Sequence, residues 1–217
     1  MQGPFSQSEA FTGFQTGGPQ QSDGRFSHSR YVVSRKLLKL IGAAFYVHDP
    51  NGQLILYANQ KAFKLKEDIR LYTGEDMTRE VLSIKARSIM DFSAAYDVVD
   101  AQTGQKVGTL KRKGLQSWIQ DEWAILDAQD REMGTVKEDN AMFALIRRFI
   151  DFAAFVLPQS FEVTLGNRPV GIFKQTRNPF SSKLEADLTP DTGNILDRRL
   201  ALAAAVLLVA IEGKQTG

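Results

Sequence analysis

The stretch Asn194-Ile-Leu-Asp-Arg-Arg-Leu-Ala-Leu-Ala-Ala-Ala-Val-Leu-Leu-Val-Ala-Ile-Glu212 decides how the rest of the chain is interpreted. Every residue from Leu200 to Ile211 is apolar, and alanine and leucine are the strongest helix formers. We expect a helix over 194–212, with Asn194 as its N-cap and Gly213 directly after its last turn. A helix that is apolar on all sides is either a membrane span or a helix enclosed by protein.

The length of this apolar run separates the two alternatives. A membrane span needs about 20 apolar residues to cross roughly 30 Å of hydrocarbon, whereas this run extends over roughly 18 Å. Charged residues at both ends prevent a longer run, so a buried helix is favoured over a span. These charged residues are Asp197, Arg198, Arg199 and Glu212. The core-forming residues of the helix are expected to be Leu200, Leu202, Ala204, Val206, Leu207, Leu208 and Ile211.

The composition excludes several classes of protein. A chain of 217 residues can form one substantial domain, and its formal net charge of +2 is too small to indicate nucleic-acid binding. There is no cysteine, which excludes disulfides, thiolate metal sites and palmitoylation, and the only histidines are His28 and His48. No signal peptide is recognisable at the N-terminus, so we expect a cytoplasmic protein, with peripheral membrane association as the alternative location.

Residues 1–29 are rich in Gly, Gln and Ser and contain almost no aliphatic side chains. Such a segment cannot bury enough surface to offset its ordering entropy, so we expect a disordered tail before a domain at 30–217. Four phenylalanines are spaced through this tail, namely Phe5, Phe11, Phe14 and Phe26. They are interpreted as solvated side chains or, alternatively, as a docking motif for a protein partner.

From Tyr31 onward, short runs of strand-forming residues come in pairs that are separated by Gly, Asp and Asn turns, such as Asp49-Pro-Asn-Gly52. Apolar residues alternate within several runs, as at Phe161, Val163 and Leu165, which indicates strands with one buried face. The sequence therefore predicts about twelve antiparallel strands. Their expected ranges are 31–35, 43–48, 53–57, 69–73, 80–86, 95–99, 106–112, 122–126, 132–137, 160–165, 169–174 and 183–188.

Many successive half-buried strands require a shared interior, and closure into a barrel also removes exposed edges. About eight strands already leave an interior just wide enough for side chains, so a barrel of twelve needs something to fill it. The apolar helix at 194–212 has a suitable shape. We therefore expect a mainly β protein in which a closed antiparallel barrel encloses this central helix.

The segment 139–156 interrupts the series of strands. Met142, Leu145, Ile146 and Phe149 recur at helical spacing, with Arg147 and Arg148 between them. We expect an inserted helix that packs on the outside or across one end of the barrel. The alternative is an interfacial helix that presents its aromatic residues to a membrane.

Several segments resemble the LURP-one-related family, within the Tubby C-terminal-like superfamily that also contains the phospholipid scramblases. The segment Ser34-Arg-Lys-Leu-Leu38 resembles the family's basic-then-aliphatic strand end, and Lys111-Arg-Lys-Gly-Leu115 and Lys85-Ala-Arg-Ser-Ile89 repeat it. Tyr46-Val-His-Asp-Pro-Asn-Gly52 resembles the first complete hairpin, and Asp197-Arg-Arg199 precedes the apolar helix where the family has its central helix. The resemblance covers residues 31–217 and implies a twelve-stranded barrel around a helix.

The resemblance implies lipid-headgroup recognition, lipid scrambling or another regulatory role without a catalytic site. Scramblases carry a cysteine cluster for acylation and an acidic, calcium-loop-like segment before the last helix, and this chain has no cysteine. The corresponding stretch 187–194 contains Pro190 and lacks a closing glutamate, so a turn before the helix is favoured over a calcium site. The residues of such a calcium site would be Asp187 and Asp191.

Motifs of nucleotide-binding loops, zinc proteases and serine hydrolases are absent from the sequence, so we expect no enzyme activity, no metal and no cofactor. Basic residues cluster at the ends of strands, where they either keep the surface soluble or form an anion site. Consecutive residues such as Lys111 and Arg112 point to opposite faces of a strand, so they cannot all share one site. The candidate headgroup-binding residues are Arg35, Lys36, Lys39, Lys61, Lys64, Lys111, Arg112 and Lys113.

Three functions follow from these expectations. The first is a non-enzymatic barrel that binds anionic lipid headgroups (phosphoinositide or phosphatidylserine) at a membrane surface, or a protein partner. The second is a membrane-associated, scramblase-like lipid transporter. The third is a nucleic-acid-binding regulator, which the near-neutral charge disfavours.

Overall fold

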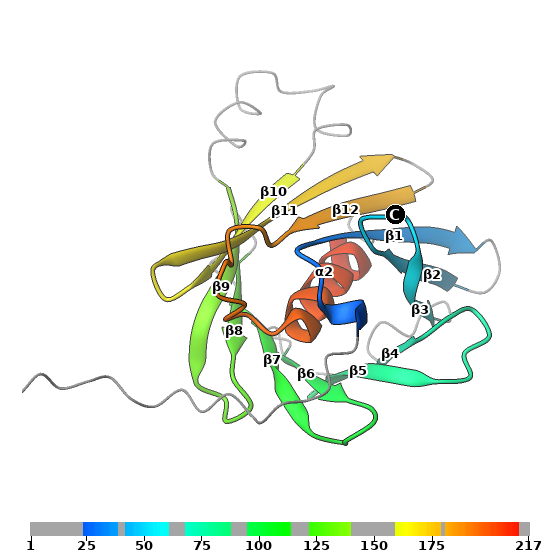
Figure 1. Cartoon of the computed structure of the whole chain (residues 1–217), viewed down its shortest axis with the longest axis horizontal. Coiled ribbons are helices and arrows are strands. Elements are labelled where there is room, and N and C mark those ends of the chain that lie inside the picture. Colours follow the sequence, from blue (N-terminus) through cyan, green and yellow to red (C-terminus); the bar gives the residue numbers. More distant parts are fainter. Residues whose placement is uncertain are drawn as a thin grey trace, which may run out of the picture.

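In a computed structural model, the structure describes residues 24–38, 42–60, 68–87, 95–113, 122–139, 159–178 and 181–212. Consecutive strands pair in antiparallel fashion and β1 pairs with β12, so the twelve strands close into a barrel (Figure 1). The predicted mainly β fold, a closed twelve-stranded antiparallel barrel with one C-terminal helix, is confirmed. The elements are η1 (Gly24–Phe26), β1 (Arg30–Leu38), β2 (Gly42–His48), β3 (Leu54–Gln60), β4 (Ile69–Tyr72), β5 (Glu80–Ala86), β6 (Ala95–Asp100), β7 (Lys106–Arg112), β8 (Glu122–Leu126), β9 (Glu132–Glu138), β10 (Gln159–Leu165), β11 (Arg168–Asn178), β12 (Ser181–Asp187) and α2 (Arg198–Glu212).

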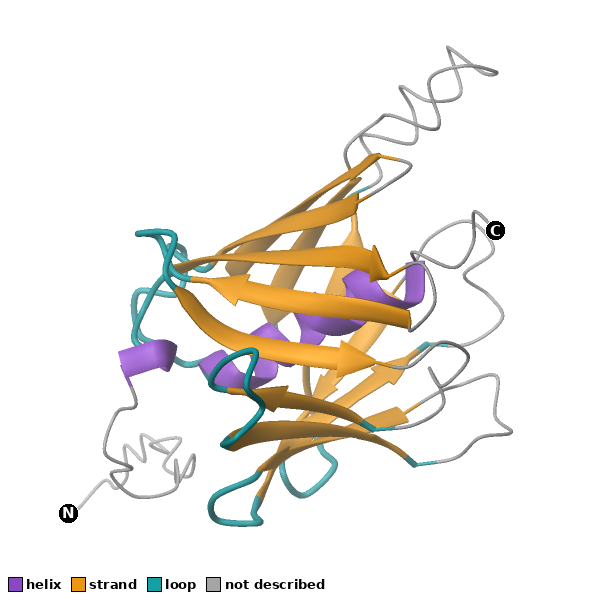
Figure 2. Ribbon diagram, turned by 90° about the vertical axis from the view of Figure 1, so that its right-hand side faces the viewer, coloured by secondary structure: helices purple, strands orange, loops and turns teal. Residues whose placement is uncertain are grey.

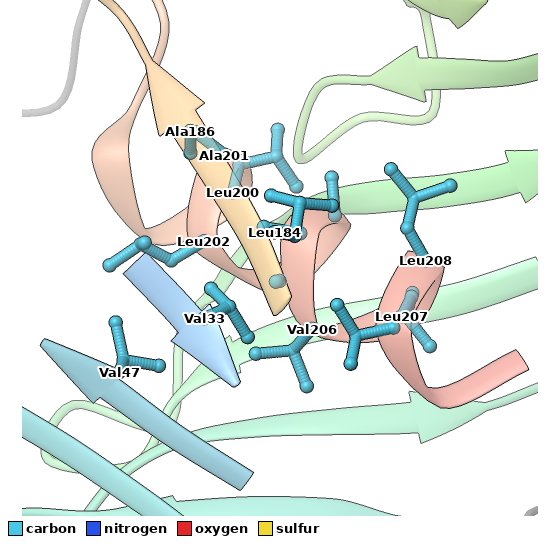
Figure 3. Close-up of a cluster of buried hydrophobic side chains, with 14 of the residues drawn as sticks. Val33, Val47, Leu184, Ala186, Leu200, Ala201, Leu202, Val206, Leu207 and Leu208 are labelled. Carbon is cyan, nitrogen blue, oxygen red and sulfur yellow. The ribbon is translucent and has the colours of Figure 1, made fainter. Parts of the chain in front are cut away.

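The alternation of apolar residues gives each strand one face in the barrel interior. Val33 of β1 pairs with Val47 of β2 and with Leu184 of β12, and all three side chains are fully buried. Figure 3 shows these side chains together with apolar residues of α2. The period of two that is visible in the sequence is therefore the period of burial in the barrel.

Aspartates begin several of the hairpin turns and hold them by hydrogen bonds to the backbone. In the turn between β2 and β3, Oδ1 of Asp49 accepts hydrogen bonds from the backbone N–H groups of Asn51 (2.9 Å) and Gln53 (2.8 Å). Gly52 in the same turn has a φ of +79°, a conformation that glycine adopts without strain. Asp100 and Asp127 accept equivalent bonds in the turns that follow β6 and β8.

Helix α2 begins at Arg198, four residues after the predicted N-cap. The carbonyl oxygen of Asp197 accepts from Ala201 N (3.0 Å), and its carboxylate Oδ1 accepts from Arg199 N (2.9 Å). Asp197 is therefore the N-cap residue. Asn194 lies in the preceding loop with a φ of +48°, so the prediction that it caps the helix is wrong.

The packing of α2 is apolar on all sides. Every residue from Leu200 to Ala210 is buried and Ile211 is partly buried, so all seven predicted core-forming residues pack in the hydrophobic core. The helix contacts β1 and β12 on one part of the barrel wall, and β6 and β7 on another. Gly108 of β7 allows this close approach, because a Cβ atom there would lie 2.9 Å from Leu200 Cδ2.

The segment before β1 packs against the barrel. Phe26 in η1 lies against the hydrophobic core, and the carbonyl oxygen of Ser29 accepts a hydrogen bond from Leu188 N. The predicted disordered tail of 1–29 is therefore too long at its end, and Phe26 is not a solvated side chain. Residues 1–23, and the predicted inserted helix from residue 140 onward, lie outside the described residues.

Candidate functional site

The two ends of the barrel differ in what they carry. Because all neighbouring strands are antiparallel, the odd-numbered strands all run toward the same end. The hairpin turns, residues 188–197 and the start of α2 lie at the opposite end, which we call the turn end (Figure 2). The end at which the odd-numbered strands finish is called the basic end, because strand-end lysines and arginines lie there.

The structure describes five of the eight candidate headgroup-binding residues, and all five lie at the basic end. Arg35 and Lys36 lie near the end of β1, and Lys111, Arg112 and Lys113 lie at the end of β7. Lys36 is exposed and its Nζ lies 4.8 Å from the centre of the Tyr46 ring. The other three candidates are Lys39, Lys61 and Lys64, which lie outside the described residues.

These residues do not form a single pocket. Strands β1 and β7 are separated by six steps in either direction around the closed barrel. With strands about 4.8 Å apart, opposite walls of such a barrel lie roughly 20 Å apart. One lipid headgroup cannot bridge that distance, so the basic residues lie in two groups on opposite sides of one end of the barrel.

Carboxylates neutralise one member of the group on β7. Lys113 Nζ lies 3.1 Å from Glu122 Oε1 and 2.8 Å from Glu132 Oε1, and its hydrogen bond to Glu132 is the main reason that its pKa is raised. By contrast, Lys85 and Lys111 are exposed and have no ion pair with another residue in the described part of the chain.

Arg87, directly after β5, belongs to a second network on the outer surface of the barrel. Its guanidinium donates to Asp97 (2.9 and 2.7 Å) and also to Asp130, and the hydrogen bonds to these two carboxylates raise its pKa. Lys106 Nζ lies 2.6 Å from Asp130 Oδ1, and the buried Thr109 hydroxyl donates to Asp97 (2.7 Å). Burial alone would raise the pKa of Asp97, but hydrogen bonds from Arg87 and Thr109 hold it below its usual value. The network contains two cations and two carboxylates, so it leaves no net charge for a ligand.

A row of polar side chains lies on the interior face, and of its five members Arg35 alone was identified from the sequence. Gln175 of β11 is fully buried and its Nε2 donates to Oγ of Ser182 on β12 (3.0 Å). On the next two strands, Gln159 Nε2 donates to Oε1 of the buried Glu138 (2.9 Å). Arg35 of β1 pairs in register with Ser182. These five residues follow one another around the wall from β1 to β9, and we call them the polar arc.

The two candidate calcium ligands have other partners at the turn end. Asp191 accepts from Ile195 N (2.9 Å) and Leu196 N (3.0 Å), and its Oδ2 lies 2.7 Å from Arg198 Nη1. Asp187 accepts from Thr189 N (2.9 Å) and lies 3.3 Å from Arg30 Nε. Both carboxylates therefore hold the chain before α2. No group of three potential metal ligands occurs among the residues that the structure describes.

Helix α2 is too short and the described chain contains no other helix with the length and hydropathy that a membrane crossing requires. A family model described as LURP-one-related matches residues 54–209. No curated protein and no solved structure matches the chain.

Proposed function

The chain belongs to the LURP-one-related family, and from this premise we propose that it is a non-enzymatic barrel protein that docks through its basic end onto membrane surfaces carrying anionic lipid headgroups. The headgroups would be phosphatidylserine or phosphoinositides. The barrel supplies a rigid frame, and the strand ends supply the contacts.

One observation carries this proposal, namely that exposed lysines without an ion pair among the described residues lie at one end of the barrel on separate strands. Lys36 lies on β1, Lys85 on β5 and Lys111 on β7. An ammonium group that no carboxylate neutralises keeps its full attraction for a negatively charged surface.

The spacing of these lysines favours a membrane surface over a single headgroup. Lysines on opposite walls, roughly 20 Å apart, can contact several headgroups of one flat membrane together. Each basic residue near an anionic surface contributes about 1 kcal/mol, so the contributions become useful only when several residues act together. The attraction should weaken as salt is added, because the Debye length shortens.

Co-sedimentation with vesicles tests the proposal. We expect the full chain to bind vesicles of phosphatidylcholine containing phosphatidylserine or a phosphoinositide at low salt, and not vesicles of phosphatidylcholine alone. The double variant Lys36→Gln/Lys111→Gln should bind about 30-fold more weakly, which corresponds to about 2 kcal/mol. The matched control is Arg79→Gln/Arg168→Gln, which removes two exposed charges from the turn end.

The control should bind nearly as well as the unmodified protein. Lack of binding to either anionic vesicle at low salt would contradict the proposal. Equal weakening by the two double variants would also contradict it, because net charge and not the basic end would then control binding.

We further propose that α2 occupies the barrel interior as a plug. Its burial on all sides and its contacts with β1, β12, β6 and β7 support this arrangement. Ala204→Asp should then unfold the protein, because it places an unpaired charge in an apolar core. Circular dichroism measures this loss, with the exposed Asn59→Asp as a control. If Ala204→Asp stays folded and only leaves the membrane fraction, the helix is an anchor and the plug is excluded.

A further inference from the structure

The side chain of Arg35 belongs to the interior face of the barrel, as that of Arg112 on β7 does. Residues of one face recur at every second position of a strand. Tyr31 and Val33 are buried in the core, and Arg35 is the next residue of the same face. Lys36, its neighbour in sequence, is exposed on the outer face.

The guanidinium of Arg35 has no counter-charge among the described residues. Its Nε is buried and forms no hydrogen bond, and burial lowers the pKa of the side chain. A buried donor that finds no acceptor destabilises the folded state, and a charged donor does so more strongly. The residue as a whole is only half-buried, so part of it remains accessible from the basic end.

The neighbours of Arg35 are polar on one side only. Ser182 lies opposite it on β12, and Phe45 lies opposite it on β2. Beyond Ser182, the polar arc continues with Gln175 on β11. The carboxylate of the arc belongs to Glu138 on β9, four strands away from β1, where it accepts from Gln159. At about 4.8 Å per strand, that carboxylate is too far around the wall to pair directly with Arg35.

We propose that Arg35 anchors a binding site for a phosphate group in the barrel interior at the basic end, with Ser182 and Gln175 beside it. A guanidinium presents two parallel N–H groups to two oxygens of an oxyanion. A carboxylate has only these two oxygens. A phosphate group has at least one more oxygen, which can accept hydrogen bonds from the hydroxyl and amide side chains of the polar arc. The phosphate group belongs either to a soluble phosphate ester or to a lipid headgroup.

This site is separate from the outward-facing lysines of the basic end, and it does not depend on the membrane docking proposed above. The two chemistries also differ in specificity. Exposed lysines attract any anionic surface, whereas a buried guanidinium requires an anion small enough to enter the interior.

The experiment follows the Nε–Hε resonances of the arginines by ¹H–¹⁵N NMR on the full chain. Arg35→Lys assigns the Arg35 signal by its disappearance. The protein is then titrated with inorganic phosphate, with glycerol 3-phosphate and with vesicles containing phosphatidic acid, against chloride at equal ionic strength. We expect the Arg35 signal to shift and to saturate with phosphate, and not to respond to chloride.

Variants give the strength of the contact. Arg35→Gln and Arg35→Lys should both bind phosphate roughly 10- to 100-fold more weakly. Lys36→Gln is the matched control, because it removes the same charge one residue away on the outer face. It should keep phosphate affinity within about threefold.

The outcomes separate the two sources of phosphate. Saturation with inorganic phosphate or glycerol 3-phosphate assigns a soluble ester, and a response only to vesicles containing phosphatidic acid assigns a headgroup. If neither changes the Arg35 signal, the proposal is overturned. It is also overturned if Lys36→Gln weakens phosphate binding as much as Arg35→Gln does. A strong loss of stability of Arg35→Gln in the absence of any anion would overturn it as well, because Arg35 would then have a partner within the chain. Failure of vesicle docking by Lys36→Gln/Lys111→Gln would leave this result unaffected.

Discussion

Replacement of Asp191 by asparagine removes one charge from a buried ion pair that holds the start of α2. Asp191 is 4% exposed and Arg198 is 7% exposed, and their Oδ2 and Nη1 atoms lie 2.7 Å apart. The same carboxylate accepts from Ile195 N and Leu196 N. An amide keeps one acceptor oxygen for these backbone groups, but it leaves the guanidinium of Arg198 without its counter-charge.

Breaking a buried pair by removal of one partner costs about 3–5 kcal/mol. Domains have a free energy of unfolding of about 5–15 kcal/mol, so Asp191→Asn should remove about a fifth or more of it. With a urea dependence of about 3 kcal/mol per molar, the midpoint should fall by roughly 1 to 1.7 M. Asn194 Oδ1 also accepts from Arg198 (2.6 Å), and this bond limits the loss.

Urea unfolding followed by tryptophan fluorescence measures this shift. The control is Asp187→Asn in the same part of the chain, where the pair with Arg30 is exposed and should contribute less than about 1 kcal/mol. The double variant Asp191→Asn/Arg198→Met should recover part of the loss, because it also removes the unpaired guanidinium. A loss for Asp191→Asn no larger than that of the control, or a double variant less stable than Asp191→Asn alone, would refute the reasoning.

Two further predictions concern packing and pH. Gly108→Ala should lower the free energy of unfolding by about 1–3 kcal/mol, because the new Cβ would lie 2.5 Å from a backbone carbonyl oxygen and 2.9 Å from Leu200 Cδ2. Urea unfolding measures this loss. An unchanged free energy of unfolding would contradict the tight approach of α2 to β7. For Asp100, burial alone would raise the pKa, but hydrogen bonds from Thr103 and Arg199 hold it below its usual value. Because the folded pKa is lower than the unfolded pKa of about 3.9, this stabilisation is present above about pH 4 and is lost as the pH falls through the folded value. The Asp100→Asn variant should therefore be less stable than the unmodified protein at pH 7, and its free energy of unfolding should fall less between about pH 4 and 2. If the variant and the unmodified protein lose the same free energy over this pH range, the role of Asp100 is contradicted.

The strands were predictable because burial alternates and turn residues recur. All twelve expected ranges overlap a strand of the structure, but β11 continues to Asn178, whereas the predicted range ends at 174. The reason is Gln175, a polar residue that faces the interior and bonds to Ser182. A hydrophobic pattern cannot reveal a strand whose interior face becomes polar near its end.

The start of α2 was not predictable from local residues, since Asn194 and Asp197 are both good N-caps. The choice between them depends on Asp191, whose carboxylate binds the backbone of the loop that follows. That arrangement also requires Arg198 to be buried, which is a property of the folded barrel.

The headgroup-binding role of the strand-end basic residues stays a prediction. Arg35 and Lys36 were grouped because they are adjacent, although the alternation Tyr31, Val33, Arg35 already indicates that the two side chains lie on opposite faces. The network of Arg87 and Asp130 had no such signal, because 43 residues separate its members. A protein partner for the phenylalanines of residues 1–23 stays a prediction.

The aspartates of the turn end and the basic residues of the other end use their charges differently, and this difference separates residues that maintain the fold from residues available for binding. At the turn end, Asp49, Asp100 and Asp191 direct their oxygens to backbone N–H groups of the turns or of the loop before α2. The oxygens of these carboxylates are therefore used in hydrogen bonds that maintain the fold, and substitution of these aspartates should lower the free energy of unfolding.

At the basic end, by contrast, Lys36, Lys85 and Lys111 have no ion pair within the described chain, and the Nε of Arg35 is buried without a hydrogen bond. An unneutralised charge adds little to stability on the outer surface, and it costs stability in the interior. Neither position is explained by folding alone. Substitutions at this end should therefore change ligand binding while the free energy of unfolding stays nearly constant, or rises in the case of Arg35.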